Sequence, residues 1–582
     1  MSWSSMSDGT GQDAHSCDVL VIGAGAAGLT TAITARKLGL DVLVVEKEPV
    51  FGGTTALSGG WLWVPCSSHA LKAGIVDSLD SAREYLRSEI GASFDAAKVD
   101  AYLENAPRMV DFLERETAVR FMLGPTYPDY HPDQPGGKAA GRAICAMPFD
   151  GRELGADLAR LRLPVREMTL YGLKVGSGPD FHHFLNARRS LRSAWHVTRR
   201  IARHAADVLL HGRDLLLMSG NALAARLARS ALDLGIPVWL NAPAVELLQD
   251  TGAYGTIRVR GAIVKVKGKP VHVTARCGVV CAGGGFSHDL VRRQQLFAHK
   301  PATGEHYSLA APGNTGDGLR LAESVGGYVE TRMVAAAPWM PVSRVSYADG
   351  SSGTYPHSYE RGKPGVIAVT VAGTRFSNES NSYHDVVQAL IETQADGQPL
   401  SAFLVCDHRF VQRYGLGIAK PFPLPLRPYL RSGYLLRAGT LAALAAKAGI
   451  APEALERTVA QFNANVALGT DPDFGRGTNA YNAYQGDPAH RPNPCLASIV
   501  HPPFYCVKIV PGDLGTFMGI ATNAWGGVIN RGGAPVEGLF AVGNDMASLF
   551  DGHYPGPGSN LGPAMTFGYL CARYMAGQFN PS

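Results

Sequence analysis

Three glycines near the N-terminus, Gly23, Gly25 and Gly28, have the spacing with which a backbone can approach a pyrophosphate. They directly follow an apolar run, Val19 to Ile22, and precede a stretch with helical periodicity. Such glycines allow a sharp turn, a close approach to the phosphates and tight packing of a helix on a strand. Glu46 follows about 20 residues later, where a carboxylate can accept hydrogen bonds from a ribose. These residues predict a dinucleotide site on a strand, helix, strand unit.

Other segments extend this site. The loop FGGTTALSGGWLWVP can wrap a diphosphate, and it contains no histidine for covalent attachment of a flavin. The segments CGVVCAGGGF and GLFAVGND each form an apolar strand that opens into a glycine turn, and the return of the distant C-terminal segment favours FAD, bound non-covalently, over NAD. The predicted cofactor-binding residues are Gly23, Gly25, Ala26, Ala27, Gly28, Glu46, Lys47, Gly53, Thr54, Thr55, Ser58, Gly59, Gly60, Ala244, Val245, Ala282, Gly283, Gly284, Gly543, Asn544, Gly558, Asn560 and Leu561.

Two loops rich in proline and glycine carry tyrosines. The segment MLGPTYPDYHPDQPGG contains Tyr130, and HYPGPGSNLGP contains Tyr554 just before a helix predicted to start near Pro563. On residue type alone, a loop tyrosine more often packs or faces solvent than reacts. Ser559 or Asn560 can cap the helix, and its positive end would face an anion or an electron-rich ring held at residues 554–558.

The chain needs more than one hydrophobic core, because 582 residues exceed the size of a single domain. The order of elements predicts an α/β fold with an α+β insert, in which a Rossmann-like FAD-binding domain is interrupted by a catalytic or substrate domain. The predicted divisions are a flexible tail (1–16), the first part of the FAD-binding domain (17–300), the catalytic domain (301–502) and the C-terminal part of the FAD-binding domain (503–582).

Composition excludes several classes of function. The net charge of +5 is spread over 582 residues and gives no reason to expect a nucleic-acid partner. The nine cysteines include no C-x-x-C pair, so we expect reduced thiols rather than a zinc site or a disulfide scaffold, and no metal. We find neither a signal peptide nor a run long enough to span a bilayer, and a cytoplasmic protein is expected.

Residues 181–213 are predicted to form a basic amphipathic helix. Its basic residues are Arg188, Arg189, Arg192, Arg199, Arg200 and Arg203. Such a helix can lie on an anionic membrane, here at the inner face, but a solvated face or a subunit contact is the simpler interpretation and is favoured.

Taken together, these segments resemble the fumarate reductase and 3-ketosteroid dehydrogenase superfamily of flavoproteins, and the steroid branch more closely. The matches are GAGAAG with Glu46, FGGTTALSGGWLWVP, PDYHPDQPGG, FSNESNSYHD and HYPGPGSNLGPAMTFGY, which are distributed over nearly the whole chain. The segment TFMGIATNAWGG departs from the pattern, because Phe517 and Met518 replace smaller or charged residues expected there. This difference concerns the shape of the substrate pocket.

The resemblance to 3-ketosteroid Δ1-dehydrogenases implies an activity and a set of catalytic residues. Tyr554 and the N–H group of Gly558 would hold the C3 ketone oxygen of a 3-ketosteroid, and Tyr383, supported by Tyr130, would take the C2 proton. Flavin N5 would accept hydride from C1, and an external acceptor such as a quinone or a dye would reoxidise the flavin.

Other activities stay open. Desaturation of the 4,5 bond, or of another cyclic ketone, would use the same polarising groups. A fumarate reductase type enzyme is less favoured, because the arginines and histidine that hold a dicarboxylate are not found. A flavin-binding protein without catalysis is disfavoured, since it gives no reason for three tyrosines that match a ketone-oxidising site.

Overall fold

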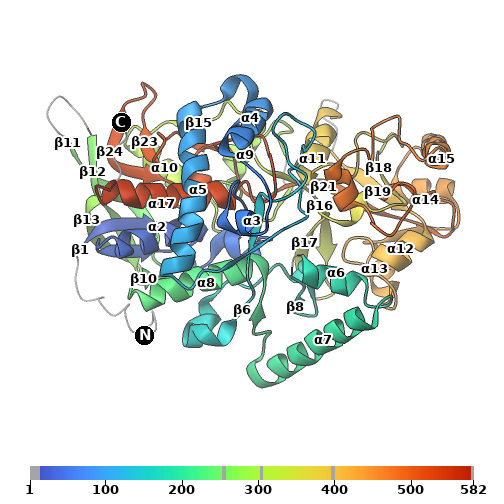
Figure 1. Ribbon diagram of the computed structural model, residues 1–582, viewed down its shortest axis with the longest axis horizontal. Coiled ribbons are helices and arrows are strands. Elements are labelled where there is room, and N and C mark those ends of the chain that lie inside the picture. The colour runs from blue at the N-terminus through green and yellow to red at the C-terminus, as the bar shows by residue number, and fades with distance from the viewer. Residues whose placement is uncertain (1–13, 177, 252–256, 302–305, 395–399, 579–582) are drawn as a thin grey trace.

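The computed structural model describes residues 14–176, 178–251, 257–301, 306–394 and 400–578. Two sheets lie side by side along the long axis, and both ends of the described chain lie on the side of the first sheet (Figure 1). The first sheet carries the dinucleotide motif, and the second is built mainly from residues 339–513.

The first sheet has eight strands. They are β10 (Val238–Trp239), β2 (Val42–Val45), β1 (Ala14–Ile22), β13 (Lys269–Cys281), β12 (Ile257–Val266), β24 (Pro535–Ala541) and β23 (Gly527–Ile529) in spatial order, with β11 (Ala244–Thr251) paired to β12. Five of them, β10, β2, β1, β13 and β24, run parallel. The last residues of these strands pair with one another across the sheet, namely Trp239, Val45, Ile22, Cys281 and Ala541. Their carboxyl ends therefore meet at one edge of the sheet, where ligands bind in such folds.

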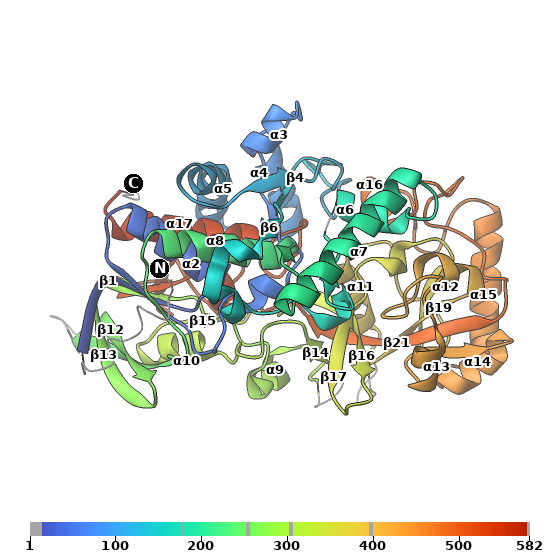
Figure 2. The same ribbon diagram turned by 90° about the horizontal axis from the view of Figure 1, so that it is seen from below.

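Helix α2 (Ala26–Lys37) is buried between this sheet and other helices. Its residues from Ala26 to Ala35 are all buried, because α8 (Ser219–Asp233) and α17 (Leu561–Met575) both pack against it and α5 (Ala96–Glu116) covers α17. Figure 2 shows these helices as a layer on one face of the sheet. The small side chains of α2 permit this close packing on all sides.

The first strand begins earlier than expected. The prediction of a flexible tail over residues 1–16 is wrong for Ala14, His15 and Ser16, which already belong to β1 and pair with residues 272–274 of β13. Residues 1–13 lie outside the described part of the chain.

The second sheet is mainly antiparallel. Its strands are β17 (Ser352–Pro356), β16 (Trp339–Ser346), β21 (Phe504–Asp513), β19 (Ala402–Cys406) and β18 (Val366–Thr370), with β14 (Tyr307–Ser308) and β20 (Leu436–Ala438) paired to β21. Helix α11 (Tyr383–Glu392) packs on β16, and α14 (Leu441–Ala448) and α15 (Pro452–Ala467) pack on each other at the outer end of the sheet.

Two contacts place the domain boundaries differently from the sequence-based divisions. Strand β21 begins after residue 502 yet pairs with β16 and β19. Helix α10 (Asp317–Ser324) lies within the predicted catalytic domain yet packs on β11 of the first sheet. We therefore propose that, apart from the short strand β14, the chain leaves the FAD-binding domain after α10 and returns to it after β21.

Smaller elements complete the fold. The remaining strands are β3 (Trp61–Trp63), β4 (Phe121–Leu123), β5 (Ala143–Ala146), β6 (Phe149–Asp150), β7 (Thr169–Leu170), β8 (Leu173–Lys174), β9 (Leu216–Leu217), β15 (Val329–Glu330) and β22 (Gly519–Ile520). The remaining helices are α3 (Ser68–Lys72), α4 (Leu79–Ile90), α6 (Pro179–Leu185), α7 (Leu191–His211), α9 (Leu290–Leu296), α12 (His408–Tyr414), α13 (Arg427–Arg431) and α16 (Ala480–Gln485).

The predicted basic helix is two helices, α6 and α7, separated at residues 186–190. Helix α7 lies along the lower edge of the molecule in Figure 1. Not all of its arginines face solvent, because Arg200 pairs with Asp180 and Arg203 with Asp150. Among the described residues, no helix is both long and apolar enough to cross a bilayer.

Candidate active site

The glycine turns converge at the carboxyl edge of the first sheet. Gly23 has φ +117°, and a Cβ there would lie 2.2 Å from the Ala282 carbonyl oxygen, so only glycine fits beside that chain. Gly543 follows β24 with φ +66°, and a Cβ there would lie 2.9 Å from the Cβ of Ala27 on α2. Three turns from distant parts of the sequence thus form one surface next to the start of α2.

The start of α2 and Glu46 fit a dinucleotide. Gly25 is the N-cap of α2 and provides no side-chain cap. The two carboxylate oxygens of Glu46 accept hydrogen bonds from the Ala24 and Glu48 N–H groups at 3.0 Å, which fixes the carboxylate beside the turn. Each oxygen keeps a second lone pair with which to accept from a ribose hydroxyl. A helix N-terminus, glycine-rich turns and a carboxylate held in place are the features that FAD binding requires.

The hydroxyl loop lies against this turn. Thr55 Oγ1 accepts from the Ala26 N–H at 3.0 Å, and Thr54 Oγ1 accepts from the Ala311 N–H at 2.9 Å and the Asn314 amide at 3.0 Å. The Ser58 hydroxyl stabilises the loop itself, since it donates to the Thr55 carbonyl at 2.8 Å. The predicted loop residues Gly53, Thr54, Thr55, Ser58, Gly59 and Gly60 therefore lie together, and the hydroxyl hydrogen of Thr54 stays available to a ligand.

Three further predicted cofactor residues, Lys47, Ala244 and Val245, follow or lie near β2. Lys47 pairs with Asp317 and donates to Thr315 Oγ1 at 2.7 Å, which links the end of β2 to α10. Ala244 and Val245 begin β11, close in sequence to Ala242, whose N–H donates to the Glu46 carbonyl at 2.8 Å. The Val245 side chain is 44% exposed.

Asp545 is a residue of this site that the sequence did not reveal. Its carboxylate is buried and accepts from the N–H groups of Gly283 at 2.6 Å and Gly285 at 2.8 Å. Burial raises the pKa of Asp545 to about 6, although the two N–H donors oppose this shift. Asp545 joins the turns after β13 and β24. Its position directly after Gly543 and Asn544 is the sequence feature that could have placed it near this site.

A cavity opens at the N-terminus of α17. It is lined by Thr516, Phe517, Gly543, Asn544, Met546, Ala547, Ser548, Leu549, Ser559, Asn560, Pro563, Ala564 and Phe567. Helix α17 begins at Leu561, and the expected cap is wrong, because Asn560 is the N-cap residue without a side-chain hydrogen bond and Ser559 Oγ bonds within its own turn to Gly556. The first turn of α17 therefore has no side-chain cap, and the positive end of the helix dipole lies at the cavity, where it would favour an electron-rich ring.

Three tyrosines from separate segments meet beside this cavity. Tyr130 Oη donates to Tyr383 Oη at 3.0 Å, and Tyr383 Oη donates to Tyr554 Oη at 3.1 Å. Tyr130 and Tyr554 are 3% and 4% exposed, and Tyr383 is partly buried. The sequence separations are 253 and 171 residues, so only the fold brings these hydroxyls into one chain.

The turn at residues 554–558 is fixed by its surroundings. The Pro555 carbonyl accepts from the Tyr130 N–H at 2.9 Å and from Tyr85 Oη at 2.6 Å. Gly558 has φ +94°, and a Cβ there would lie 2.4 Å from the Trp61 carbonyl oxygen. No hydrogen-bond acceptor for the Gly558 N–H occurs among the residues that the structure describes. Tyr554 and Gly558 thus offer an O–H and an N–H from one rigid turn.

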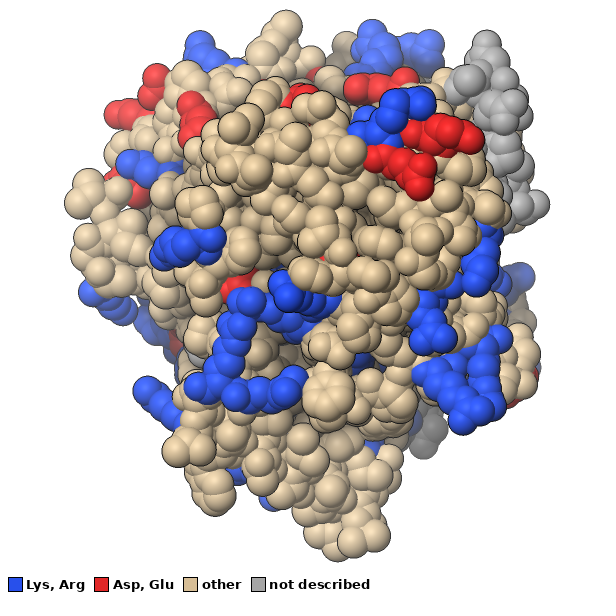
Figure 3. Space-filling view, turned by 90° about the vertical axis from the view of Figure 1, so that its right-hand side faces the viewer, with Lys and Arg blue, Asp and Glu red and all other residues tan. Residues whose placement is uncertain are grey.

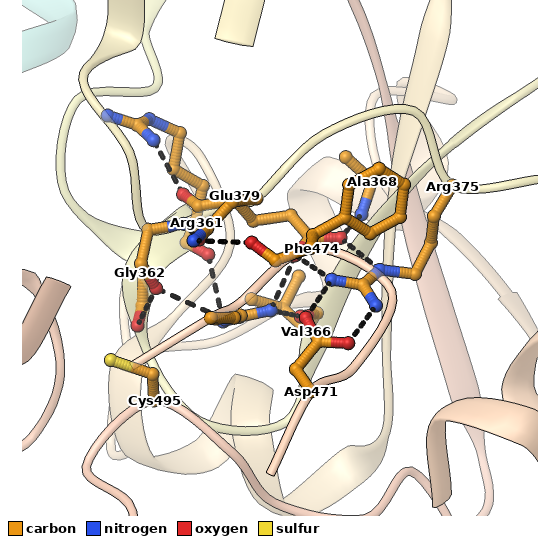
Figure 4. A network of polar contacts seen from close by, with 12 residues as sticks. Arg361, Gly362, Val366, Ala368, Arg375, Glu379, Asp471, Phe474 and Cys495 are labelled. Atoms are coloured by element: carbon orange, nitrogen blue, oxygen red, sulfur yellow. Dashed lines mark hydrogen bonds and ion pairs between the residues drawn. The ribbon is translucent and has the colours of Figure 1, made fainter. Parts of the chain in front are cut away.

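A buried ion-pair network supports the turn that precedes Tyr383. Glu379 accepts from Arg375, Arg476 and the Ala368 N–H, and Arg375 also pairs with Asp471 (Figure 4). Burial opposes ionisation of Glu379, but Arg375 and Arg476 outweigh it and lower its pKa. Four residues later α11 begins with Tyr383, and Ser382 caps it by accepting from the Asp385 N–H at 3.2 Å.

The phenols are difficult to ionise. Burial raises the pKa of Tyr383 well above its ordinary value, and the hydrogen bond from Tyr130 lowers it without cancelling the effect of burial. Burial also raises the pKa of Tyr554 to about 12. Both hydroxyls therefore keep their protons near neutral pH, and Tyr554 can act as an O–H donor there.

Two further side chains pack on the tyrosines. The ring centroid of Phe517 lies 6.0 Å from Tyr554, and His384 lies 5.9 Å from Tyr554 and 5.8 Å from Phe517. Burial lowers the pKa of His384 to about 4, so this imidazole is neutral. Phe517, which departs from the resemblance, therefore lies beside the predicted ketone donor. In the described part of the chain, no cluster of three metal-ligating side chains occurs.

Comparison with known proteins supports the cofactor and the class of enzyme. Residues 18–561 match the family model for an FAD binding domain. The chain is 38% identical to 4-oxocyclohex-2-ene-1-carboxylate 5-dehydrogenase of Sinomonas cyclohexanicum, over 96% of this chain and 94% of the relative. It is 36% identical to 3-oxosteroid 1-dehydrogenase of Mycolicibacterium smegmatis, over 97% of each.

A solved structure is similar over the whole fold. The crystal structure of 3-ketosteroid Δ1-dehydrogenase from Sterolibacterium denitrificans in complex with 1,4-androstadiene-3,17-dione superposes with a TM-score of 0.89 at 34% identity, and the match covers 97% of this chain and 100% of that chain. The predicted α/β fold and the FAD cofactor are thus confirmed. The chain belongs to the FAD-binding flavoprotein family that includes the 3-oxosteroid 1-dehydrogenases, and it is an FAD-dependent oxidoreductase acting on CH–CH bonds.

Proposed function

We propose that this enzyme desaturates the 1,2 bond of a 3-ketosteroid. The observation that carries the proposal is the chain of three hydroxyls, in which Tyr383 lies 3.1 Å from Tyr554 and 3.0 Å from Tyr130. The C2 carbon is one bond from the C3 carbonyl, so the base must lie next to the group that binds the ketone oxygen. Tyr383 and Tyr554 meet this requirement.

The turn at residues 554–558 would polarise the ketone. Tyr554 O–H and Gly558 N–H donate to the C3 oxygen and stabilise the enolate that forms as the C2 proton leaves. Tyr383 reacts as the tyrosinate, which the hydrogen bond from Tyr130 stabilises; its Oη takes that proton and becomes a neutral hydroxyl. The buried positions of Tyr130 and Tyr554 exclude water, which strengthens both effects.

The cofactor site supplies the second half of the reaction. When bound, FAD provides the hydride acceptor for C1. The N-terminus of α17 borders the adjoining cavity, where the positive end of the helix dipole would favour the negative charge of a reduced ring. Turnover would then require an external electron acceptor, such as a quinone or an artificial dye.

Anaerobic mixing with 4-androstene-3,17-dione tests the proposal. We expect bleaching of the oxidised flavin and a 1,4-diene product identified by mass and ring position. Tyr383→Phe should abolish bleaching and Tyr554→Phe should slow it by about 10²- to 10³-fold, while flavin stays bound in both variants. Bleaching with a product desaturated elsewhere, or no bleaching by any 3-ketosteroid, would contradict the proposed substrate or regiochemistry.

A smaller cyclic ketone is the second candidate. The relative at 38% identity is named for an oxocyclohexene carboxylate, and the large ring of Phe517 lies beside Tyr554, where it would narrow the pocket. The same donors and base would serve a cyclohexanone or the 4,5 bond of a steroid. A panel of saturated 3-ketosteroids and cyclohexanones, compared by kcat/KM, separates these candidates.

We also propose that α7 contacts anionic membranes, where hydrophobic steroids accumulate. Its apolar side chains are exposed: Leu191 (92%), Trp195 (71%), Leu209 (85%) and Leu210 (73%). Arg188, Arg189, Arg192 and Arg199 on α7 or just before it are exposed as well. Figure 3 shows basic side chains prevailing over the lower half of the right-hand face, on the side of the molecule where α7 lies. Such a surface suits an anionic interface.

Sedimentation with vesicles tests the membrane contact. Binding to vesicles with anionic lipid, weakened by Trp195→Glu and by added salt, is the expected result. Absence of binding to both anionic and neutral vesicles would remove the idea. A dimer that Trp195→Glu dissociates would instead assign this surface to a subunit contact.

A further inference from the structure

His131 lies between two carboxylates from different helices. Its Nδ1 atom is 2.8 Å from Glu89 Oε2 on α4, and its Nε2 atom is 3.0 Å from Asp385 Oδ2 on α11. The His131 side chain is 32% exposed, whereas those of Glu89 and Asp385 are 5% and 26% exposed. The imidazole therefore links the two helices through partly buried contacts.

Both contacts require the protonated ring. A neutral imidazole has one N–H, so one of its nitrogens would face a carboxylate without a hydrogen between them, whereas the imidazolium donates to both. Burial alone would lower the pKa of His131, but the charges and hydrogen bonds of Asp385 and Glu89 outweigh it and raise the pKa to about 11. The ring is thus a doubly hydrogen-bonded cation at neutral pH.

The two anchored segments carry the tyrosines. His131 directly follows Tyr130, and Asp385 lies two residues after Tyr383, in the first turn of α11. The backbone N–H of His131 donates to Tyr85 Oη at 3.3 Å. Tyr85 in turn donates to the Pro555 carbonyl beside Tyr554. Tyr130 itself lies in an irregular loop and not in a helix or strand that would fix its position.

We propose that His131 is a positioning residue that holds the Tyr130 hydroxyl on Tyr383 by tying the Tyr130 loop to the start of α11. The proposal rests on the function proposed above, in which Tyr130 supports Tyr383 as the base. Tyr383 belongs to the second half of the molecule, so the His131 to Asp385 ion pair sets the distance between hydroxyls that come from different halves. Misplacement by about 1 Å can cost on the order of 10²-fold in rate.

The test compares His131→Gln in two backgrounds. In the wild-type background we expect kcat to fall about tenfold with KM nearly unchanged, because the base is misaligned while the ketone donors stay in place. In a Tyr130→Phe background, His131→Gln should reduce kcat by less than about twofold, because the hydroxyl that His131 positions is already absent. A merely structural role would cost the same in both backgrounds.

Matched variants separate the two carboxylates. Asp385→Asn should reproduce the kcat loss of His131→Gln, and Glu89→Gln should cost less, because the contact with the Tyr383 helix survives. His69→Gln is the control, since His69 Nε2 contacts Glu114 at the same 2.8 Å between α3 and α5; it should leave kcat unchanged. Flavin content and Tm report whether each variant folds.

The results distinguish failure of the role proposed for His131 from failure of the proposed function. If Tyr130→Phe retains full kcat, the role of Tyr130 is wrong and this inference fails with it. If Tyr130→Phe is impaired but His131→Gln and Asp385→Asn are not, only the role of His131 is overturned. Equal losses from His131→Gln in both backgrounds would also overturn it.

Discussion

A buried tyrosine is almost fully protonated near neutral pH. It can act as a base only if its surroundings stabilise the tyrosinate or make the substrate proton more acidic. The free pKa of tyrosine is about 10, and burial moves that of Tyr383 further up. Two neighbours compensate in the proposed reaction: Tyr130 stabilises the tyrosinate, and the donors at residues 554–558 acidify the substrate proton. The balance between them sets the pH at which the enzyme works.

The pH dependence of kcat/KM therefore reports on Tyr383. We expect the rate to rise with pH in the alkaline range, because the reactive form has lost the Tyr383 proton. In Tyr130→Phe the rising limb should move to higher pH, since loss of the donor to Tyr383 Oη raises the pKa of Tyr383. A pH profile from stopped-flow flavin reduction checks this, and an unshifted limb would contradict it.

Removal of the proposed ketone donor Tyr554 should slow the reaction without releasing the flavin. Tyr554→Phe is expected to lower kcat/KM by about 10²- to 10³-fold, as for the loss of other oxyanion donors, with flavin absorbance retained. Tyr505→Phe is the matched control, because Tyr505 is equally buried but bonds to His408 on α12. A similar loss in both variants would point to general damage.

At the scale of elements, acids in turns join distant strands. Asp545 holds the turn after β13 beside the turn after β24, and both turns belong to the proposed cofactor site. Asparagine would turn an N–H group toward one glycine N–H and leave a buried donor unpaired, which costs about 1–3 kcal/mol.

Asp545→Asn should therefore weaken FAD binding. We expect a lower ratio of flavin to protein after dialysis and a lower Tm that added FAD partly restores. Asp233→Asn, on the surface of α8, serves as the control. Full flavin retention in Asp545→Asn would show that the turns are held without this carboxylate.

The network around Glu379 similarly supports the Tyr383 helix. Glu379→Gln removes one partner of a buried ion pair, which costs about 3–5 kcal/mol, and should lower both Tm and kcat. Because the folded-state pKa of Glu379 is depressed, its stabilising effect is present above about pH 4.5 and is lost as pH falls through the lower folded value.

The difference in Tm between wild type and Glu379→Gln should consequently shrink toward acid pH. Thermal melts from pH 7 downward measure it, with Glu392→Gln as the control, since Glu392 is exposed near the end of α11. A difference that stays constant down to the lowest accessible pH would count against the ionised pair.

At the scale of the whole molecule, local patterns were readable and distant contacts were not. The turn at Gly23 to Gly28 could be predicted because strand, turn and helix are consecutive in the chain. The partner of β21 could not, since its pairing with β16 and β19 is decided by tertiary packing. Likewise the position of Asp545 after Gly543 and Asn544 suggests that it lies near the site, but not that it contacts Gly283 and Gly285 about 260 positions away.

The three tyrosines with proposed catalytic roles could be predicted from the sequence only in part. Resemblance to a family suggested Tyr130, Tyr383 and Tyr554, but residue type alone favoured packing for a loop tyrosine. Their hydrogen bonds to one another depend on the arrangement of three segments, and their catalytic roles stay predictions. His131 lies in the segment PDYHPDQPGG, but the sequence predicts no role for it, because its partners Glu89 and Asp385 lie elsewhere in the chain.

The position of Tyr383 on a helix separate from Tyr554 and Gly558 has a consequence for the evolution of new specificities. The proposed ketone donors lie in the chain segment that also forms part of the proposed cofactor site, whereas the helix that carries the proposed base packs on β16 of the other sheet. Lineages could therefore exchange or reshape the second sheet to admit rings of different size while inheriting the ketone-activating turn intact. Enzymes descended from a common ancestor would then diverge in substrate and keep one chemical step.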